Sequence, residues 1–295
     1  MFQLFGVPSQ ALFAQLMLGL VNGSFYALLS LGLAVIFGML NVINFAHGAQ
    51  YMLGAFTAFF LLQYLGLDYW WALLIAPIVV GISGMIIERL FLQWIANLDH
   101  LYGLLLTFGL ALIVEGVFRN FFGSSGLPYT VPPALQGGRN LGFMFLPNYR
   151  AWVVVFSLVV CLITWFLIER TKLGAYLRAA TENPTLVRAF GINVPRLITL
   201  TYGVGVGLAA LAGVMAAPIT NVSPQMGANL IIVVFAVVVI GGMGSIMGAI
   251  VTGFGLGLIE GLTKVYYPEA ANTAIFVIMA IVLLVRPAGL FGRRA

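Results

Sequence analysis

Residues 11–38 read ALFAQLMLGLVNGSFYALLSLGLAVIFG, a run without a single charged side chain. The run belongs to a longer uncharged stretch, Met1 to Leu67, and a second stretch of this kind extends from Leu197 to Ile259. About 20 consecutive apolar residues are enough to cross the hydrocarbon core of a membrane. Backbone polar groups are satisfied in lipid only in helices or closed barrels, and these apolar runs are continuous rather than alternating. The sequence therefore predicts an all-α, polytopic membrane protein.

The composition of the whole chain leads to the same class. Of 295 residues, 62% are hydrophobic and only 7% are charged, whereas a soluble domain has roughly 25% charged residues. This argues against a soluble enzyme, and the apolar content excludes disorder. The net charge of +5 does not indicate a nucleic-acid partner, because the basic residues lie in loops between apolar runs. The single cysteine, Cys161, excludes an intrachain disulfide and a cysteine-based metal site.

Eight apolar runs are expected to form membrane helices. They are residues 11–38, 45–65, 69–87, 102–122, 152–168, 197–217, 229–262 and 272–285. A straight helix over 229–262 would be roughly 50 Å long, against about 30 Å for the hydrocarbon core. The glycines near its middle predict a break there, and residues 22–24 are candidates for a bend in the first run. We therefore expect eight to ten crossings, and the sequence leaves open whether the break turns the chain fully.

Basic residues gather in two segments that we place on the cytoplasmic side. The loop 168–197 holds five of the thirteen basic residues, and the tail adds three more. The loop 123–150 is rich in Gly, Pro and Asn, and one crossing separates it from the basic loop, so we place it outside. It either meets an external partner or is a plain connector. The basic residues of the loop 168–197 and of the tail are Arg170, Lys172, Arg178, Arg188, Arg196, Arg286, Arg293 and Arg294.

Motifs for chemistry are missing from the sequence. There is no GxxxxGK[ST] phosphate-binding loop, no HExxH motif and no Ser/His/Asp set. The glycines at 203, 205 and 207 lie in a membrane run with no preceding strand, which is typical of helix packing. The two histidines, His47 and His100, have too few carboxylates near them for a metal site. We therefore expect no catalytic residue and no bound metal.

Residues 171–196, TKLGAYLRAATENPTLVRAFGINVPR, contain the signals of a short capped helix. Asn183 can act as N-cap, and Pro184 takes the first helical position. Gly191 lies where a left-handed C-cap residue would end the helix. Leu186 and Phe190 form one apolar face, and two turns are too short to be stable alone. From these residues alone, the helix either docks in a groove of a partner or lies on lipid headgroups.

Four motifs resemble those of a known family, the branched-chain amino-acid permeases of ABC importers (the H-type subunit). AATENP at 179–184, followed by GIN at 191–193, resembles the coupling-loop signature of importer permeases, although it departs from the plain EAA order. NVINFAHG at 41–48 resembles a motif that follows the first span. GGMGS at 241–245, followed by Gly248, and RPAGLFG at 286–292 complete the resemblance, which runs in family order over nearly the whole chain.

The resemblance implies an ABC importer permease fold, with residues 1–295 as a single transmembrane permease domain. The chain would translocate branched-chain or related amino acids across the bacterial inner membrane by alternating access. A second homologous permease would complete the pore, and a periplasmic binding protein would deliver the substrate. Two ATPase subunits would hold ATP and Mg, so this chain would bind no cofactor. The residues expected to couple it to an ATPase are Glu182, Asn183, Pro184, Leu186, Arg188, Phe190 and Gly191.

Two groups of residues are candidates for lining the transport pathway. Polar groups at the border of an apolar run are costly and usually face a cavity or another helix. Packing is the alternative, since Asn44 could simply cap the second span. The candidates are Asn41, Asn44, His47, Gly48, Gly241, Gly242, Gly244 and Ser245.

Two pairs of opposite charge have the i, i+4 spacing of helical ion pairs, with Glu first. We interpret Glu115 and Arg119 as a structural pair, because pairing lowers the cost of charge in lipid. The alternative is a site that grips a zwitterion. Glu260 and Lys264 are expected to form an interface pair at the membrane edge.

The third run ends in Glu88 and Arg89. Consecutive residues of a helix do not share a face. We expect these two side chains to face headgroups or partner chains.

Three other functions are alternatives to this reading. Relatives of the same importer type carry urea, amides or aromatic acids, so the substrate class is open. An ion-coupled secondary transporter would need intramembrane carboxylates or a sodium site near broken helices. A channel would need no docking helix.

Overall fold

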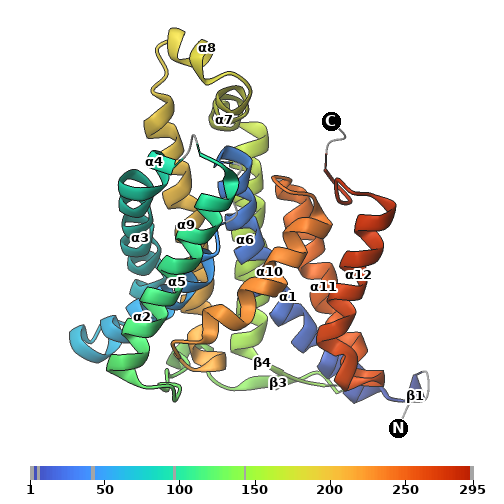
Figure 1. Ribbon diagram of the computed structural model, residues 1–295. Coiled ribbons are helices and arrows are strands. Elements are labelled where there is room, and N and C mark those ends of the chain that lie inside the picture. Colours follow the sequence, from blue (N-terminus) through green and yellow to red (C-terminus); the bar gives the residue numbers. More distant parts are fainter. Residues whose placement is uncertain (1–2, 5–6, 41–43, 96–97, 143, 293–295) are drawn as a thin grey trace. The chain divides into compact units, whose positions relative to one another are not determined.

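The computed structural model of the chain describes residues 3–4, 7–40, 44–95, 98–142 and 144–292 (Figure 1). Within these residues, seven helices are long and apolar enough to cross a membrane. The all-α, polytopic prediction is therefore confirmed. The helices are α1 (Ser9–Leu40), α2 (Ala46–Leu65), α3 (Tyr69–Ile87), α4 (Gln93–Ile95), α5 (His100–Phe122), α6 (Asn148–Arg170), α7 (Lys172–Glu182), α8 (Pro184–Ala189), α9 (Val194–Thr220), α10 (Met226–Gly241), α11 (Ile246–Tyr266) and α12 (Ala271–Val285).

The remaining elements are short. A π-helical turn, Glu88–Leu92, joins α3 to α4, and 3-10 turns cover Pro133–Leu135 and Pro268–Ala270. Two hairpins pair β1 (Gln3–Leu4) with β2 (Val7–Pro8) and β3 (Gly138–Asn140) with β4 (Phe145–Pro147). The last hairpin and the Leu127–Val222 bridge give the predicted external loop a non-helical structure.

The chain divides into two compact units. Unit 1 comprises Met1–Ser30, Val131–Cys161 and Val233–Ala295, and unit 2 comprises Leu31–Thr130 and Leu162–Ile232. Helices α1, α6 and α10 each contribute a part to both units. Asn41 and the tail residues Arg293 and Arg294 lie outside the described residues.

Unit 2 is built around α9, which packs against α2 and α3. Small residues let the backbones approach closely, as is usual for helices in lipid. A Cβ atom at Gly81 would lie 2.9 Å from the Gly203 carbonyl oxygen, and one at Gly54 would overlap Ala210. The close approach of α9 to α2 and α3 at these positions therefore depends on glycine and alanine.

Unit 1 packs the first part of α1 against α11 in the same way. A Cβ atom at Gly253 would lie 2.6 Å from the Cα atom of Ala27, and one at Gly257 would overlap Gly19 and Gly23. The glycines at 253, 257 and 261 have the i, i+4 spacing expected for such a stripe, and the structure assigns the stripe to this contact within the chain.

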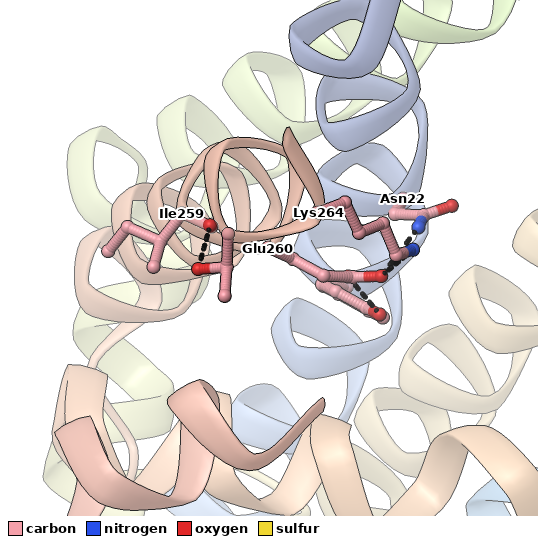
Figure 2. Close-up of polar contacts among 6 residues, drawn as sticks. Asn22, Ile259, Glu260 and Lys264 are labelled. Atoms are coloured by element: carbon pink, nitrogen blue, oxygen red, sulfur yellow. Dashed lines mark hydrogen bonds and ion pairs between the residues drawn. The ribbon is translucent and has the colours of Figure 1, made fainter. Parts of the chain in front are cut away.

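A buried carboxylate lies in this contact between α1 and α11. Glu260 is 2% exposed and accepts hydrogen bonds from the Tyr26 hydroxyl (2.7 Å) and the Asn22 amide (3.0 Å). Figure 2 shows Lys264 and Asn22 directed toward Glu260, and Lys264 forms an ion pair with it. The expected i, i+4 pair of Glu260 and Lys264 is therefore confirmed, and residues of α1 also cover Glu260.

The glycine break in the seventh run is a true turn. Helix α10 ends at Gly241 and α11 begins at Ile246, while Gly242 and Gly244 have φ angles of +101° and +79°. Glycine adopts such angles without steric cost. Ser245 caps α11 by accepting a hydrogen bond from the Gly248 amide (3.1 Å).

The RPAGLFG segment binds this turn. The Leu290 amide donates to the Ile240 carbonyl (2.8 Å), and the Phe291 amide donates to the Gly241 carbonyl (3.1 Å). Two motifs far apart in the sequence thus form one structure in unit 1.

The turn also bears on the predicted side of the tail. Helices α9, α10, α11 and α12 lie along the chain between the basic loop and the tail. Two segments on one side of a membrane are separated by an even number of crossings, so the expectation that the basic loop and the tail are both cytoplasmic requires that all four helices cross fully. Helix α10 has 16 residues, or about 24 Å, which is shorter than the hydrocarbon core of about 30 Å, and it is not among the seven described helices that are long enough to cross. The candidate bend at residues 22–24 does not interrupt α1, which is continuous from Ser9 to Leu40.

Candidate functional site

Helix α8 has the caps that the sequence predicts. The Asn183 side chain accepts a hydrogen bond from the Leu186 amide (2.9 Å), and Pro184 takes the first helical position. Gly191 follows with a φ angle of +82°, and its amide donates to the Arg188 carbonyl (2.9 Å). A Cβ atom at Gly191 would meet nothing within 4 Å, so the backbone conformation alone requires glycine there.

One side of α8 is anchored and the other is exposed. Val187 is 6% exposed and packs in a cluster with Ala180 and Val194. Leu186 and Phe190 are 54% and 77% exposed. The sequence reasoning found the exposed face and missed the anchor, although the spacing of seven residues between the three clustered side chains was a signal for it.

The basic loop contains a second helix, α7, that the sequence reasoning also missed. Gly174, Leu177 and Ala180 face inward at intervals of three residues, whereas Leu173 and Tyr176 are exposed. This amphipathic spacing was the available signal. We call residues 172–191, with α7 and α8, the coupling arm. Figure 1 shows the coupling arm beyond the end of α9 that starts at Val194.

The surface of the coupling arm combines apolar and charged side chains. Arg178 forms an ion pair with Glu169 (3.5 Å) and donates to the Ile168 carbonyl (3.2 Å), so it ties α7 back to α6. Exposed apolar side chains with basic neighbours are suited to docking an acidic-rimmed, apolar groove. The exposed charged residues of this region are Lys172, Arg178, Glu182, Arg188 and Arg196.

The first group of pathway candidates is buried in unit 2. Asn44 is 1% exposed, and its amide donates to the Tyr202 hydroxyl (2.9 Å) and to Gln50 Oε1 (3.4 Å). It does not cap α2, whose N-cap is Phe45 without a side-chain bond. His47 and Gly48 are also buried. The structure brings these three candidates together and adds two polar residues, Gln50 and Tyr202, that sequence reasoning missed.

A small cavity lies beside Asn44. Its volume is about 20 Å³, which is room for one water molecule and too little for an amino acid. Asn44 Oδ1 has no hydrogen-bond partner among the described residues, so a polar acceptor faces this region. The cavity is lined by Ile36, Leu40, Asn44, Leu92, Ile95, Thr107 and Tyr202.

The second group of pathway candidates belongs to unit 1. Gly241, Gly242, Gly244 and Ser245 lie at the turn between α10 and α11, and the tail segment 286–292 contacts Gly241 and Gly242. A Cβ atom at Gly242 would lie 2.5 Å from the Gly292 nitrogen. The two groups therefore serve different packing contacts in different units, and their roles in the pathway remain predictions.

The charged pairs have different surroundings. Glu115 and Arg119 form the expected ion pair on α5, with side chains 16% and 48% exposed. Arg89 is exposed, but Glu88 is fully buried within the chain, so the expectation that the Glu88 side chain faces headgroups or partner chains is wrong. Its burial depends on α9, because Glu88 accepts a hydrogen bond from the Thr199 hydroxyl (2.7 Å). In the described part of the chain, no group of three or more His, Cys, Asp or Glu side chains could hold a metal ion.

Comparisons with known proteins show the family. Residues 15–286 match the model of the family described as "Branched-chain amino acid transport system / permease component". The chain is 30% identical over 95% of both chains to the high-affinity branched-chain amino acid transport system permease protein LivH of Escherichia coli. It is also 30% identical, over 95% of both chains, to the corresponding protein BraD of Pseudomonas aeruginosa.

Two weaker similarities accompany these. The permease protein LivM of Escherichia coli is 27% identical over 90% of this chain and 67% of its own length. Among solved structures, a chain of "PsaBC from Streptococcus pneumoniae in complex with Fab" is 15% identical, with a TM-score of 0.42 over 94% of this chain and 89% of that one. A likeness of that size supports no conclusion about this chain. The family match and the LivH and BraD similarities show that the chain belongs to the branched-chain amino acid permease component family and is a multi-pass permease subunit of an ABC importer.

Proposed function

We propose that this chain forms half of a pore in the bacterial inner membrane and imports branched-chain or related amino acids by alternating access. The relatives LivH and BraD are named for branched-chain amino acid transport, which supports this substrate class. The chain resembles both LivH and LivM, and this supports a pore made of two homologous permeases. A periplasmic binding protein would deliver the substrate to the external side.

The coupling arm is the observation that carries the proposal. Its short helix is capped at both ends, anchored by Val187, and exposes Leu186 and Phe190 on a part of the chain that we place in the cytoplasm. Burying a Leu or Phe side chain in a partner contributes about 1.5–3 kcal/mol. The arm is thus suited to dock on an ATPase subunit.

Energy would enter through the partners. This chain has no phosphate-binding loop, so ATP and Mg²⁺ would bind to two separate ATPase subunits. When these subunits close, each would move the short helix seated in it. Residues 190–193 join α8 directly to α9, so this movement would reach the helix at the centre of unit 2.

The test is copurification and uptake with the complete transporter. We expect Phe190→Ala to weaken binding of the ATPase subunits by about tenfold or more, as for a side chain at the centre of an interface. Phe121→Ala is the matched control, because Phe121 is 75% exposed on α5, far from the arm in sequence. A normal complex with Phe190→Ala would contradict docking through this helix.

The energy source and the substrate need separate measurements. Uptake into proteoliposomes should require ATP and persist when ion gradients are dissipated. Uptake that needs an ion gradient and no ATP would support a secondary transporter instead. Competition of leucine uptake by valine and isoleucine, but not by urea, amides or aromatic acids, would establish the substrate class.

A further inference from the structure

Helix α9 contacts α2 and α3 largely through glycines and backbone atoms. Glycines of α9 lie against backbone atoms of the two neighbours: a Cβ atom at Gly207 would lie 3.1 Å from the Pro77 carbonyl oxygen, and one at Gly213 would overlap Tyr51. Such contacts allow close approach of helices but contain few features that fix one helical register over another. The register of α9 must be determined by other contacts.

A buried carboxylate meets α9 near its start. Glu88 is 0% exposed and begins the π-helical turn that joins α3 to α4. Its Oε2 atom accepts hydrogen bonds from the Thr199 hydroxyl (2.7 Å) and from the Gln93 amide (3.4 Å). Its Oε1 atom has no hydrogen-bond partner among the described residues. Ionisable groups buried in membrane proteins are expensive and usually serve function, and π-helical turns are frequent at functional sites.

A second polar contact lies one turn further along α9. The Tyr202 hydroxyl accepts hydrogen bonds from Asn44 (2.9 Å) and Gln50 (3.4 Å), which lie just before and within α2. Thr199 and Tyr202 are three residues apart, so they lie on the same side of α9. Both lie within three turns of Val194, where α9 leaves the coupling arm.

We propose that the Glu88–Thr199 hydrogen bond is a latch that fixes the register of α9 against α3 and transmits displacement of the coupling arm into the membrane helices. Glu88 and Thr199 are then positioning residues for ATP-coupled transport. Buried polar pairs are best attested as devices that specify register. The inference rests on the proposed function, because it assumes that an ATPase moves the arm.

The first test compares two threonines of α9. Thr199→Val is close to isosteric and removes the hydroxyl that binds Glu88. Thr201→Val is the matched control: both threonine hydroxyls bond a carbonyl of α9 itself, that of Leu197 for Thr201 (2.8 Å) and that of Pro195 for Thr199 (3.0 Å), and Thr199 in addition bonds Glu88. In the reconstituted transporter, we expect Thr199→Val to reduce amino acid transported per ATP hydrolysed by about fivefold to tenfold, from the loss of one buried interhelical bond. Thr201→Val should keep the wild-type ratio.

Conservative variants separate coupling from folding. Thr199→Ser and Glu88→Gln keep a hydroxyl donor and an oxygen acceptor, so we expect them to retain the ratio of transport to hydrolysis. Glu88→Leu keeps the side-chain volume and removes the acceptor. We therefore expect it to lower the ratio of amino acid transported to ATP hydrolysed, as Thr199→Val does. The purified variants should melt within a few degrees of Thr201→Val, which a purely structural role of the latch would not allow.

The outcomes distinguish this inference from the proposed function. If the wild-type transporter takes up amino acids with ATP but Thr199→Val and Glu88→Leu keep its transport-to-hydrolysis ratio, the latch is refuted and the proposed function stands. If the wild-type complex shows no ATP-dependent uptake, the proposed function fails, and the latch with it.

Discussion

The Asn183 side chain accepts a hydrogen bond from the Leu186 amide at 2.9 Å, and this bond determines where α8 begins. It satisfies a backbone donor that a helix of six residues would otherwise leave to solvent. The exposed Leu186 and Phe190 are held in place by this cap at one end and by Gly191 at the other.

Removing this cap should impair coupling without unfolding the membrane helices. Asn183→Ala deletes the acceptor and should destabilise α8 by about 1 kcal/mol. We expect a severalfold loss of ATP-driven uptake, measured in proteoliposomes at equal protein levels. Asn183→Asp keeps a capping oxygen and is the matched control. Equal uptake by the Ala and Asp variants would show that the cap does not matter.

The close contact of α1 and α11 in unit 1 should make Gly257 intolerant of a side chain. A Cβ atom there would overlap the backbone of Gly19 and Gly23, so Gly257→Ala should destabilise the protein by about 1–3 kcal/mol. Gly255 lies on the same helix, and a Cβ atom there meets nothing within 4 Å. We therefore expect Gly255→Ala to melt like the wild type and Gly257→Ala to melt at a clearly lower temperature in detergent. Identical melting of the two variants would refute the contact.

Glu260 and Glu115 should differ in their contribution to stability, although both are i, i+4 partners of a basic residue. Glu260→Leu removes the acceptor of the buried Tyr26 hydroxyl and of the partly buried Asn22 amide, and leaving a buried donor unpaired costs about 1–3 kcal/mol. Glu115→Leu breaks a pair whose arginine is half exposed, and such pairs contribute about 0–1 kcal/mol. Thermal unfolding of both variants measures the difference. A smaller loss for Glu260→Leu than for Glu115→Leu would contradict the buried role of Glu260.

Tyr129, in the loop 123–150, should give the protein an alkaline limit of stability. Burial, together with Tyr69 and Asp68, raises the pKa of Tyr129 to about 12, and its hydroxyl has no hydrogen-bond partner among the described residues. Because the pKa in the folded state is higher than in the unfolded state, the stability linked to the neutral phenol is complete below about pH 10. It is lost as the pH rises from about 10 to about 12. Tyr129→Phe cannot ionise, so its melting temperature should rise relative to the wild type over this range. A constant difference would contradict a raised pKa.

The parts of the fold that depend on local sequence could be predicted. Apolar length identifies a membrane helix regardless of its neighbours, and the glycines at 241–244 mark the turn because a straight helix there would exceed the hydrocarbon core. The caps of α8 were found because capping depends on residues within one turn of the helix end.

Burial of polar groups could not be predicted in this way. Glu88 depends on Thr199, which is 111 positions away, and Glu260 depends on Asn22, which is 238 positions away. No periodicity within one helix reveals such a partner. The i, i+4 rule identified Lys264 beside Glu260 but not the two residues of α1 that bury the carboxylate.

Uptake of leucine by the complete transporter in proteoliposomes, with and without ATP, tests the central claim most directly when the wild type is compared with Phe190→Ala. The account predicts ATP-dependent uptake by the wild type and by Phe121→Ala, and a loss of about tenfold or more for Phe190→Ala together with loss of bound ATPase subunits. Undiminished ATP-dependent uptake by Phe190→Ala would contradict coupling through α8. Leucine uptake without ATP would contradict the importer mechanism itself.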